Sequence, residues 1–279
     1  MTNIHYKKAA VIGYPVRQSL SPLMHQHWMR QMGIEGEYEA IEVAPEYLGA
    51  FVLEAKKIGL SGFNVTVPHK TEILQYLDKI APLARQIGAV NTVKITPDGR
   101  LTGYNTDSLG LVTHLKSIAP DFPHDRPALI LGAGGAARAA ALGMLGENIP
   151  MVMISNRTRS KAEAIAADVG RGRMVVVDWH ARSEAVVAAG TVINTTSLGM
   201  VGQPPLSFDL SGAAKDTVIY DIVYKPLETA LLNQAKSLGL RTVDGLGMLV
   251  HQGAAAFKIW FGETVAFDAE LRIKLEAAL

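Results

Sequence analysis

The stretch that decides the fold is Ala128-Leu-Ile-Leu-Gly-Ala-Gly-Gly-Ala-Ala-Arg138. A short apolar run leads directly into Gly132, Gly134 and Ala137, which have the spacing G-x-G-x-x-A. In a strand–turn–helix unit, the first glycine permits the tight turn and the second lets backbone N–H groups approach a pyrophosphate. The small third residue lets the helix pack on the strand. Because the positive end of that helix faces the same anion, the stretch predicts a dinucleotide-binding unit.

Outward from this unit, β-rich runs alternate with segments of helical spacing towards the C-terminus. Strands that alternate with helices form right-handed βαβ units and a parallel sheet. We therefore expect an α/β fold here, closed by two helices over residues 247–261 and 267–278. The expected strands are 128–131, 151–155, 174–177, 191–195 and 217–221, and the expected helices are 136–145, 160–169 and 227–238.

The same alternation occupies the first part of the chain, which a connector separates from the second. Residues 119–127 hold three prolines and two aspartates and predict a break between two domains. Pro97-Asp98-Gly99 predicts the turn of a hairpin. Ser21-Pro22 predicts a helix that ends at Gly33, with Ser21 as its N-cap. The expected strands are 9–14, 38–43, 63–67, 90–95 and 100–104, and the other expected helices are 45–58, 71–77 and 107–118.

Composition excludes several classes of function. Of the 279 residues, 48% are hydrophobic and 19% are charged, which excludes an intrinsically disordered chain. The net charge of +1 provides no overall field that would attract nucleic acid or an acidic membrane. Cysteine is absent, which excludes disulfides, thiolate catalysis and Cys-ligated metal, and we expect no metal site. No stretch is a convincing targeting or membrane segment, so we expect a cytoplasmic protein.

The segment after the expected strand 151–155 distinguishes between dinucleotides. An NAD site usually has an Asp or Glu there, which accepts a hydrogen bond from the ribose 2′-OH. This chain has Arg157, Arg159 and Lys161 and no carboxylate between residues 155 and 161. Because a guanidinium suits a 2′-phosphate, Arg157 predicts NADP(H) rather than NAD. The alternative is a set of ordinary surface cations, which is disfavoured because basic residues at a helix start oppose its dipole.

Polar residues also follow strands of the first half, at the sheet edge where ligands bind in α/β proteins. Ser19 and Ser21 place two hydroxyls at a helix start, which suits a carboxylate, although Ser21 could serve only as an N-cap. Asn64-Val-Thr-Val-Pro-His-Lys70 offers an amide, a hydroxyl and an amine, although Lys70 alone could be a surface lysine. Asp107 opens a helix and could likewise be only its N-cap.

Together these motifs closely resemble the shikimate dehydrogenase family over nearly the whole chain. The shared motifs occur in the family's order, and they are too many to match by chance. They are Gly13-Tyr-Pro-Val-Arg-Gln-Ser19-Leu-Ser21-Pro22, Asn64-Val-Thr66-Val-Pro-His-Lys70, Gly88-Ala-Val-Asn91-Thr92, Gly103-Tyr-Asn-Thr-Asp107, Gly132-Ala-Gly-Gly-Ala136, Asn156-Arg-Thr158, Asn194-Thr-Thr-Ser-Leu-Gly-Met200, Asp221-Ile-Val-Tyr-Lys-Pro226 and Asp244-Gly-Leu-Gly-Met-Leu-Val-His-Gln252.

The resemblance implies a fold and an activity. Members of this family have a substrate domain, then a Rossmann domain, and C-terminal helices that return to the first domain. We therefore expect a substrate-binding and catalytic domain over residues 1–107, completed by 247–279, and an NADP-binding Rossmann domain over 108–246. The implied reaction is the reversible, NADPH-dependent reduction of 3-dehydroshikimate to shikimate, on the way to chorismate and the aromatic amino acids.

The resemblance also implies roles for individual residues. Lys70 and Asp107 would form the catalytic pair, with the Lys70 ammonium delivering a proton to the reacting oxygen and Asp107 positioning it. We expect His69 to be a structural histidine. Ser19 and Ser21, with Tyr224 nearby, would hold the substrate carboxylate, and Asn64, Thr66, Asn91 and Gln252 would line the pocket for its ring hydroxyls. The cofactor would contact Gly132, Ala133, Gly134, Gly135, Ala136, Asn156, Arg157, Thr158, Lys161, Ile222 and Gly245.

Two other functions remain open on the sequence. A quinate/shikimate dehydrogenase would share these motifs but accept a broader set of substrates or cofactors. A catalytically silent NADP-binding sensor would share the fold, although the presence of Lys70 and Asp107 disfavours it. The zinc motif His-Glu-x-x-His and the hydrolase motif Gly-x-Ser-x-Gly are absent. We expect a small-molecule substrate, no nucleic-acid or membrane partner, and a monomer or homodimer.

Overall fold

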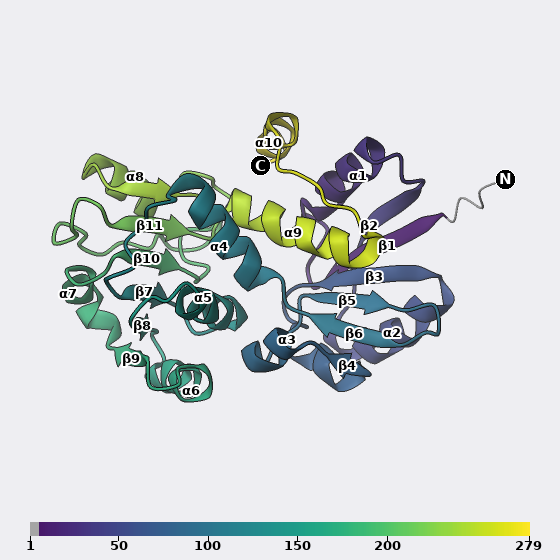
Figure 1. The fold of residues 1–279 in the computed structure, drawn as a ribbon, viewed down its shortest axis with the longest axis horizontal. Helices are drawn as coiled ribbons and strands as arrows, with labels where there is room; N and C mark the ends of the chain where they lie inside the picture. The colour runs from purple at the N-terminus through teal and green to yellow at the C-terminus, as the bar shows by residue number, and fades with distance from the viewer. Residues whose placement is uncertain (1–5) are drawn as a thin grey trace. The chain divides into compact units, whose positions relative to one another are not determined.

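The computed structural model describes residues 6–279, which divide into two compact units (Figure 1). Unit 1 contains the described residues up to Thr106 together with Gln252–Ala278, and unit 2 contains Asp107–His251 and Leu279. Each unit has its own six-stranded sheet, so the predicted α/β class is confirmed. Residues 1–5 of the expected first domain lie outside the described residues. None of the helices within residues 6–279 combines the length and the hydrophobicity that a membrane span requires.

The sheet of unit 2 is parallel throughout (Figure 1). Its order is β12-β11-β10-β7-β8-β9, which is the doubly wound order 3-2-1-4-5-6 counted from the β9 edge. The winding reverses between β7 and β10, and ligands of such sheets bind outside the carboxyl ends of the strands at this point. The strands are β7 Ala128–Leu131, β8 Val152–Ser155, β9 Met174–Val177, β10 Thr191–Asn194, β11 Val218–Asp221 and β12 Arg241–Val243.

Both faces of this sheet are covered by helices. Successive residues of a strand point to opposite faces, so Ala128 and Ile130 pack with α4, α5 and α6, whereas Leu129 and Leu131 pack with α7 and α8. Burial on both faces explains why these strands are continuous apolar runs in the sequence. The helices are α4 Asp107–Ile118, α5 Gly135–Gly146, α6 Arg159–Val169, α7 Arg182–Val186 and α8 Ala230–Ser237; the 3₁₀ turn η3 is Trp179–Ala181.

The sheet of unit 1 is mixed and has the order β2-β1-β3-β5-β6-β4. β1 lies parallel to β2 and β3, whereas β5 runs antiparallel to β3 and β6. The predicted hairpin around Pro97-Asp98-Gly99 is confirmed, because it joins β5 to β6. The strands are β1 Lys7–Gly13, β2 Gly36–Glu42, β3 Leu60–Val65, β4 Lys79–Ile80, β5 Thr92–Ile95 and β6 Leu101–Tyr104.

The C-terminal segment packs into unit 1 through two tryptophans. Trp260 donates from its indole nitrogen to the backbone oxygen of Val93 at 2.9 Å, and Trp28 of α1 donates to that of Ala266, also at 2.9 Å. These bonds tie the end of the chain to its first hundred residues. The helices are α1 Ser21–Gln31, α2 Leu48–Lys57, α3 Pro82–Ile87, α9 Leu246–Phe261, which begins in unit 2, and α10 Ala269–Glu276; η1 is Pro45–Tyr47 and η2 is Glu72–Tyr76.

The structure differs from the sequence-based expectation at the start of α1 and in the shortest elements. Leu20 occupies the N-cap of α1 and Ser21 is the first helical residue, so the prediction that Ser21 is the N-cap is wrong. Pro22 is tolerated at the second helical position because a first-turn N–H has no partner within the helix. β4, α3, α7 and β12 are not predicted from sequence, since elements of two to six residues are too short to show a period.

Candidate active site

The side-chain amide of Asn64 lies in a buried hydrogen-bond network of unit 1. Asn64 is on β3 and only 5% exposed. Its Nδ2 donates to the backbone oxygen of Asn91 at 3.1 Å and to Thr92 Oγ1 at 3.0 Å. Because a backbone oxygen can only accept, the amide nitrogen and oxygen cannot exchange places. The orientation of the Asn64 amide is therefore fixed.

Tyr38 holds the other side of this amide and is a residue that sequence reasoning missed. Its phenol donates to Asn64 Oδ1 at 2.7 Å. Burial raises the pKa of Tyr38 well above its usual value, which keeps the phenol protonated and able to donate. The contact arises because β2, β1 and β3 lie side by side, and no sequence signal pairs Tyr38 with Asn64.

Asn91, Thr106 and Gln252 extend the same network. Asn91 Oδ1 accepts from the backbone nitrogen of Thr106 at 2.8 Å, which fixes the orientation of this second amide. Its Nδ2 donates to Thr106 Oγ1 at 2.9 Å and to Gln252 Oε1 at 3.2 Å. Gln252 is on α9, 161 residues further along the chain. The structure thus brings together three of the predicted substrate residues, Asn64, Asn91 and Gln252.

Ser19 and Ser21 stand next to each other at the start of α1. The backbone nitrogen of Ser21 donates to Ser19 Oγ at 3.2 Å. Since Leu20 is the N-cap, the hydroxyl of Ser21 does not cap the helix. Two hydroxyls beside the positive end of an 11-residue helix are suited to an anion such as a carboxylate.

Lys70 lies in the turn that follows β3. It is half-buried, as is Thr66 in the same turn, and its backbone oxygen accepts from the backbone nitrogen of Val90 at 2.8 Å. The neighbouring His69 is 1% exposed and its Nε2 lies 2.7 Å from the backbone oxygen of Val43. The expectation that His69 is a structural histidine is therefore confirmed.

Asp107 is the first residue of α4 and is 5% exposed. The helix begins at Asp107, so this carboxylate lies in the first turn, at the positive end of the helix. Thr106 is a member of the Asn91 network, and consecutive Cα atoms lie about 3.8 Å apart. The covalent chain therefore places Asp107 next to a residue of that network.

The glycine turn of unit 2 has the geometry that its motif predicts. Gly132 has φ +114°, and a Cβ there would lie 2.6 Å from Thr195 Oγ1, so only glycine fits. Gly134 is the N-cap of α5, and a Cβ there would meet nothing within 4 Å. Open space at the positive end of a helix fits a pyrophosphate. The other predicted residues of this turn, Ala133, Gly135 and Ala136, are half-buried.

Two of the three cations after β8 carry no ion pair within residues 6–279. Arg159 bonds to Glu163 at 2.8 Å and to Asp178 at 2.7 Å. Arg157 and Lys161 are exposed and have no carboxylate partner in this part of the chain. Two uncompensated cations fit a 2′-phosphate better than a ribose hydroxyl. The residues present are therefore compatible with NADP(H).

The remaining predicted cofactor residues lie in turns of unit 2. Asn156 Nδ2 donates to the backbone oxygen of Thr158 at 2.9 Å, which shapes the turn from β8 to α6. Gly245 packs on the turn after β11, since a Cβ there would lie 2.3 Å from the backbone oxygen of Ile222. Tyr224, predicted for the substrate, is in the same turn of unit 2, and burial raises the pKa of its phenol.

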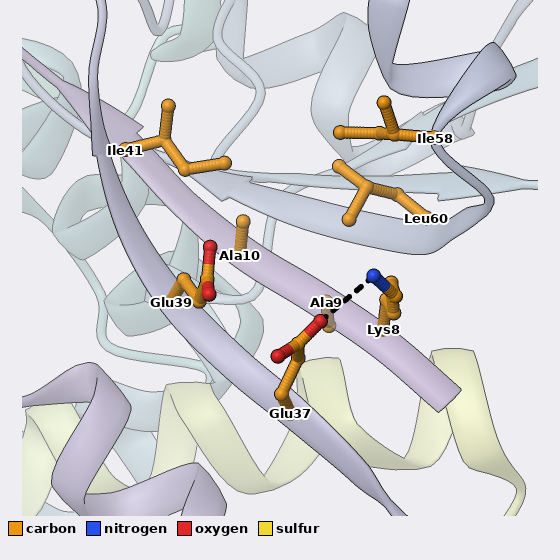
Figure 2. A pocket seen from close by; sticks show the side chains of 8 residues that line it. All are labelled: Lys8, Ala9, Ala10, Glu37, Glu39, Ile41, Ile58 and Leu60. Carbon is orange, nitrogen blue, oxygen red and sulfur yellow. Dashed lines mark ion pairs between the residues drawn. The ribbon is translucent and has the colours of Figure 1, made fainter. Parts of the chain in front are cut away.

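A separate hollow lies over β1 and β2 of unit 1, where Lys8 and Glu37 form an ion pair of 2.9 Å (Figure 2). Its volume of about 50 Å³ is far below the several hundred Å³ of a typical small-molecule site. None of the predicted site residues lines it. Among residues 6–279, no group of three or more His, Asp or Glu side chains could hold a metal ion. The lining residues are Lys8, Ala9, Ala10, Glu37, Glu39, Ile41, Ile58 and Leu60.

Comparison with protein-family models gives three matches along the chain. The model of the shikimate dehydrogenase substrate binding domain matches residues 11–93. The model of shikimate / quinate 5-dehydrogenase matches residues 115–201, and that of the shikimate 5′-dehydrogenase C-terminal domain matches residues 245–269. The matches therefore cover parts of both units.

Similar proteins match over nearly their whole length. The shikimate dehydrogenase (NADP(+)) of Azorhizobium caulinodans is 47% identical over 274 residues, which are 98% of this chain and 97% of that protein. Shikimate 5-dehydrogenase from Thermus thermophilus, solved in complex with NADP(H) and shikimate, is 36% identical with a TM-score of 0.88. The match covers 98% of this chain and 100% of that one. Quinate dehydrogenase from Corynebacterium glutamicum, solved in complex with NAD, is 31% identical with a TM-score of 0.90. The match covers 98% of this chain and 99% of that one.

Proposed function

This chain belongs to the shikimate dehydrogenase family, and we propose that Lys70 and Asp107 carry its proton chemistry while the Asn64–Asn91–Gln252 network binds its substrate. The protein is an NADP-dependent oxidoreductase that acts on a CH–OH group and interconverts 3-dehydroshikimate and shikimate. The observation that carries the assignment of residues is the buried network itself, because two of its amides have orientations that backbone groups fix.

The substrate has one carboxylate and several ring oxygens, and unit 1 offers groups for both. Ser19 and Ser21 bind the carboxylate with their hydroxyls at the start of α1. The amides of Asn64, Asn91 and Gln252 recognise the ring hydroxyls. The side-chain oxygen of Asn64 has a second lone pair, beside the one that accepts from Tyr38, with which it can accept from such a hydroxyl. The last two substrate residues are Thr66, from the turn after β3, and Tyr224, from unit 2.

The cofactor is bound by unit 2. Gly132 and Gly134 give the pyrophosphate close access to the backbone at the start of α5, and Ala133, Gly135 and Ala136 complete that turn. Arg157 and Lys161 bind the 2′-phosphate, with Asn156 and Thr158 shaping their turn. Ile222 and Gly245 line the nicotinamide end, outside the carboxyl ends of the sheet strands. When bound, NADPH supplies the hydride that is added to the substrate's carbonyl carbon.

Lys70 and Asp107 handle the charge that this addition creates. Negative charge develops on the carbonyl oxygen, and the Lys70 ammonium stabilises it and transfers a proton from Nζ to that oxygen. The Asp107 carboxylate positions the Lys70 ammonium at the reacting oxygen. In the reverse direction, neutral Lys70 accepts the proton of the substrate hydroxyl.

Two further properties belong to this proposal. We place the enzyme in the cytoplasm, where NADPH is produced for biosynthesis. We expect it to be a monomer or a homodimer. Sedimentation of the purified protein with and without NADP⁺ distinguishes the two states.

The test is a four-way assay of purified protein with shikimate or quinate, each with NADP⁺ or NAD⁺. We expect the highest kcat/KM with shikimate and NADP⁺. The quinate dehydrogenase among the solved relatives makes quinate the informative competitor. If quinate were turned over as well as shikimate, the protein would instead be a quinate/shikimate dehydrogenase. Tight NADPH binding with no turnover of either substrate would indicate the silent sensor.

A further inference from the structure

Asp221, the last residue of β11, carries a carboxylate that contacts three different segments of unit 2. It is 0% exposed. Its Oδ1 accepts from Asn194 Nδ2 at 2.9 Å and from the backbone nitrogen of Val223 at 3.0 Å. Its Oδ2 accepts from Thr229 Oγ1 at 2.7 Å. One buried side chain thus joins the end of β10, the turn after β11 and the start of α8.

A carboxylate at this position is costly, so its presence needs a reason. Burial raises the pKa of Asp221 to about 6, while the three hydrogen bonds act in the opposite direction. Ionised, the carboxylate accepts from two N–H donors on Oδ1 and from a hydroxyl on Oδ2 and has no proton of its own to place. Asparagine has the same shape, but its amide nitrogen would replace Oδ2, and the Thr229 hydroxyl would have to turn from donor to acceptor. The carboxylate accepts from all three donors as they stand, and these bonds offset its desolvation.

The side chain of Asn194 in turn holds the loop after β10 by hydrogen bonds. Its Oδ1 accepts from the backbone nitrogen of Thr196 at 3.0 Å and from Thr196 Oγ1 at 2.7 Å. Its Nδ2 also donates to the backbone oxygen of Leu198 at 3.2 Å. Asp221 accepts from the same nitrogen and so anchors the Asn194 amide, in the orientation that the backbone groups of Thr196 and Leu198 require, to the end of β11.

These loops adjoin the glycine turn. β11, β10 and β7 are neighbours in the sheet, so their carboxyl ends lie along one edge. Thr195 Oγ1 donates to the backbone oxygen of Leu131 and lies 2.6 Å from the position that a Cβ of Gly132 would take. On the other side, the backbone of Ile222 contacts Gly245. Asp221 lies beneath this edge and does not reach its surface.

We propose that Asp221 is a positioning residue for the cofactor: its carboxylate holds the loops after β10 and β11 in the shape that receives the nicotinamide half. This inference rests on the proposed function, because it takes the edge formed by Gly132, Ile222 and Gly245 as the cofactor site. It adds a residue that touches no ligand and acts through the loops that do. Asp221 therefore affects how the nicotinamide end of the cofactor is bound, and it does not affect the contact of Arg157 with the 2′-phosphate.

The experiment uses Asp221→Asn and a milder pair, Thr229→Val and Thr229→Ser. Thr229→Val removes one donor to Asp221, whereas Thr229→Ser keeps the hydroxyl and serves as the matched control. The dissociation constants of NADPH and NADH are measured by fluorescence titration, which needs no turnover. Steady-state kinetics then give kcat and KM for NADP⁺, NAD⁺ and shikimate, and circular dichroism checks folding.

We expect Asp221→Asn and Thr229→Val to weaken both NADPH and NADH about tenfold, the size of one lost charge-assisted hydrogen bond. The ratio of the two affinities should stay unchanged, in contrast to Arg157→Ala, which should change it. The KM of shikimate and the properties of Thr229→Ser should match the wild type. A purely structural role would lower thermal stability without raising the dissociation constants of the folded fraction.

Two results would overturn the inference. One is wild-type affinity for both dinucleotides in folded Thr229→Val, and the other is a change in the NADPH-to-NADH ratio. If Asp221→Asn fails to fold, the Thr229 pair still decides the question. Failure of the proposed function is recognised separately, because wild-type protein would then show no shikimate turnover in the four-way assay.

Discussion

The phenol of Tyr38 donates a 2.7 Å hydrogen bond to the side-chain oxygen of Asn64. Both hydrogens of the Asn64 amide nitrogen are already donated, to the backbone of Asn91 and to Thr92. The Tyr38 hydroxyl therefore has to be the donor in this pair. Tyr38 thus fixes the oxygen side of the amide that is proposed for a ring hydroxyl.

Tyr38→Phe should raise the KM of shikimate about tenfold, because a buried Asn64 oxygen loses its donor. The change in kcat should be smaller. The phenylalanine ring preserves the stacking of this side chain on His25, so folding should be retained. Steady-state kinetics measure the split between KM and kcat, and NADPH titration serves as the control, since the proposed cofactor residues belong to unit 2. An unchanged KM in folded Tyr38→Phe would contradict this role.

Lys70→Ala should lower kcat by a factor of about 10² to 10⁴, the usual contribution of a general acid, while the KM of shikimate changes much less. Lys70→Arg is the matched comparison, since it keeps the charge but transfers a proton poorly because of its high pKa. We expect Arg to restore substrate affinity without restoring kcat. Near-wild-type turnover of Lys70→Ala would remove Lys70 from the mechanism.

Arg157→Ala and Arg159→Ala should have different effects although the residues are two positions apart. Arg157 has no ion pair within residues 6–279, whereas Arg159 is bound by Glu163 and Asp178. Arg157→Ala should reduce the preference for NADPH over NADH by about tenfold, since a charge-assisted contact is lost. Arg159→Ala should leave the preference unchanged. Titrations with both dinucleotides make the comparison, and equal losses in the two variants would count against Arg157.

The sequence predicts the long, doubly buried and motif-bearing parts of this structure well. The helix from Asp107 to Ile118 and the strand from Ala128 to Leu131 have the predicted bounds, because each has a clear period or apolar run. The strand of Tyr38 is also predicted, but its bond to Asn64 is not, because that contact depends on which strands are neighbours. Asp221 belongs to a quoted motif, yet its role becomes visible only through its three donors.

Gly247→Ala should destabilise unit 2. A Cβ at Gly247 would lie 2.1 Å from the ring of His114, which is 1% exposed and has little room to move. Overpacking of this kind costs about 1–3 kcal/mol. Urea unfolding measures the loss, and adding His114→Ala to Gly247→Ala should return part of it by removing the ring. If the double variant were no more stable than Gly247→Ala alone, the clash would not be the cause.

His25 should contribute to the loss of stability at acid pH. Its ring is 0% exposed, lies 4.1 Å from the Tyr38 ring in a stacked arrangement, and burial lowers its pKa from 6.5 to about 3. Below pH 6.5 the unfolded chain binds a proton that the folded chain does not, so the stabilisation present above pH 6.5 is lost as the pH falls towards 3. The expected slope is about 1.4 kcal/mol per pH unit. His25→Phe should remove this slope from urea-unfolding free energies between pH 6.5 and 5. The same change at the exposed His180 should not, and an unaltered slope in His25→Phe would show that His25 is not the group responsible.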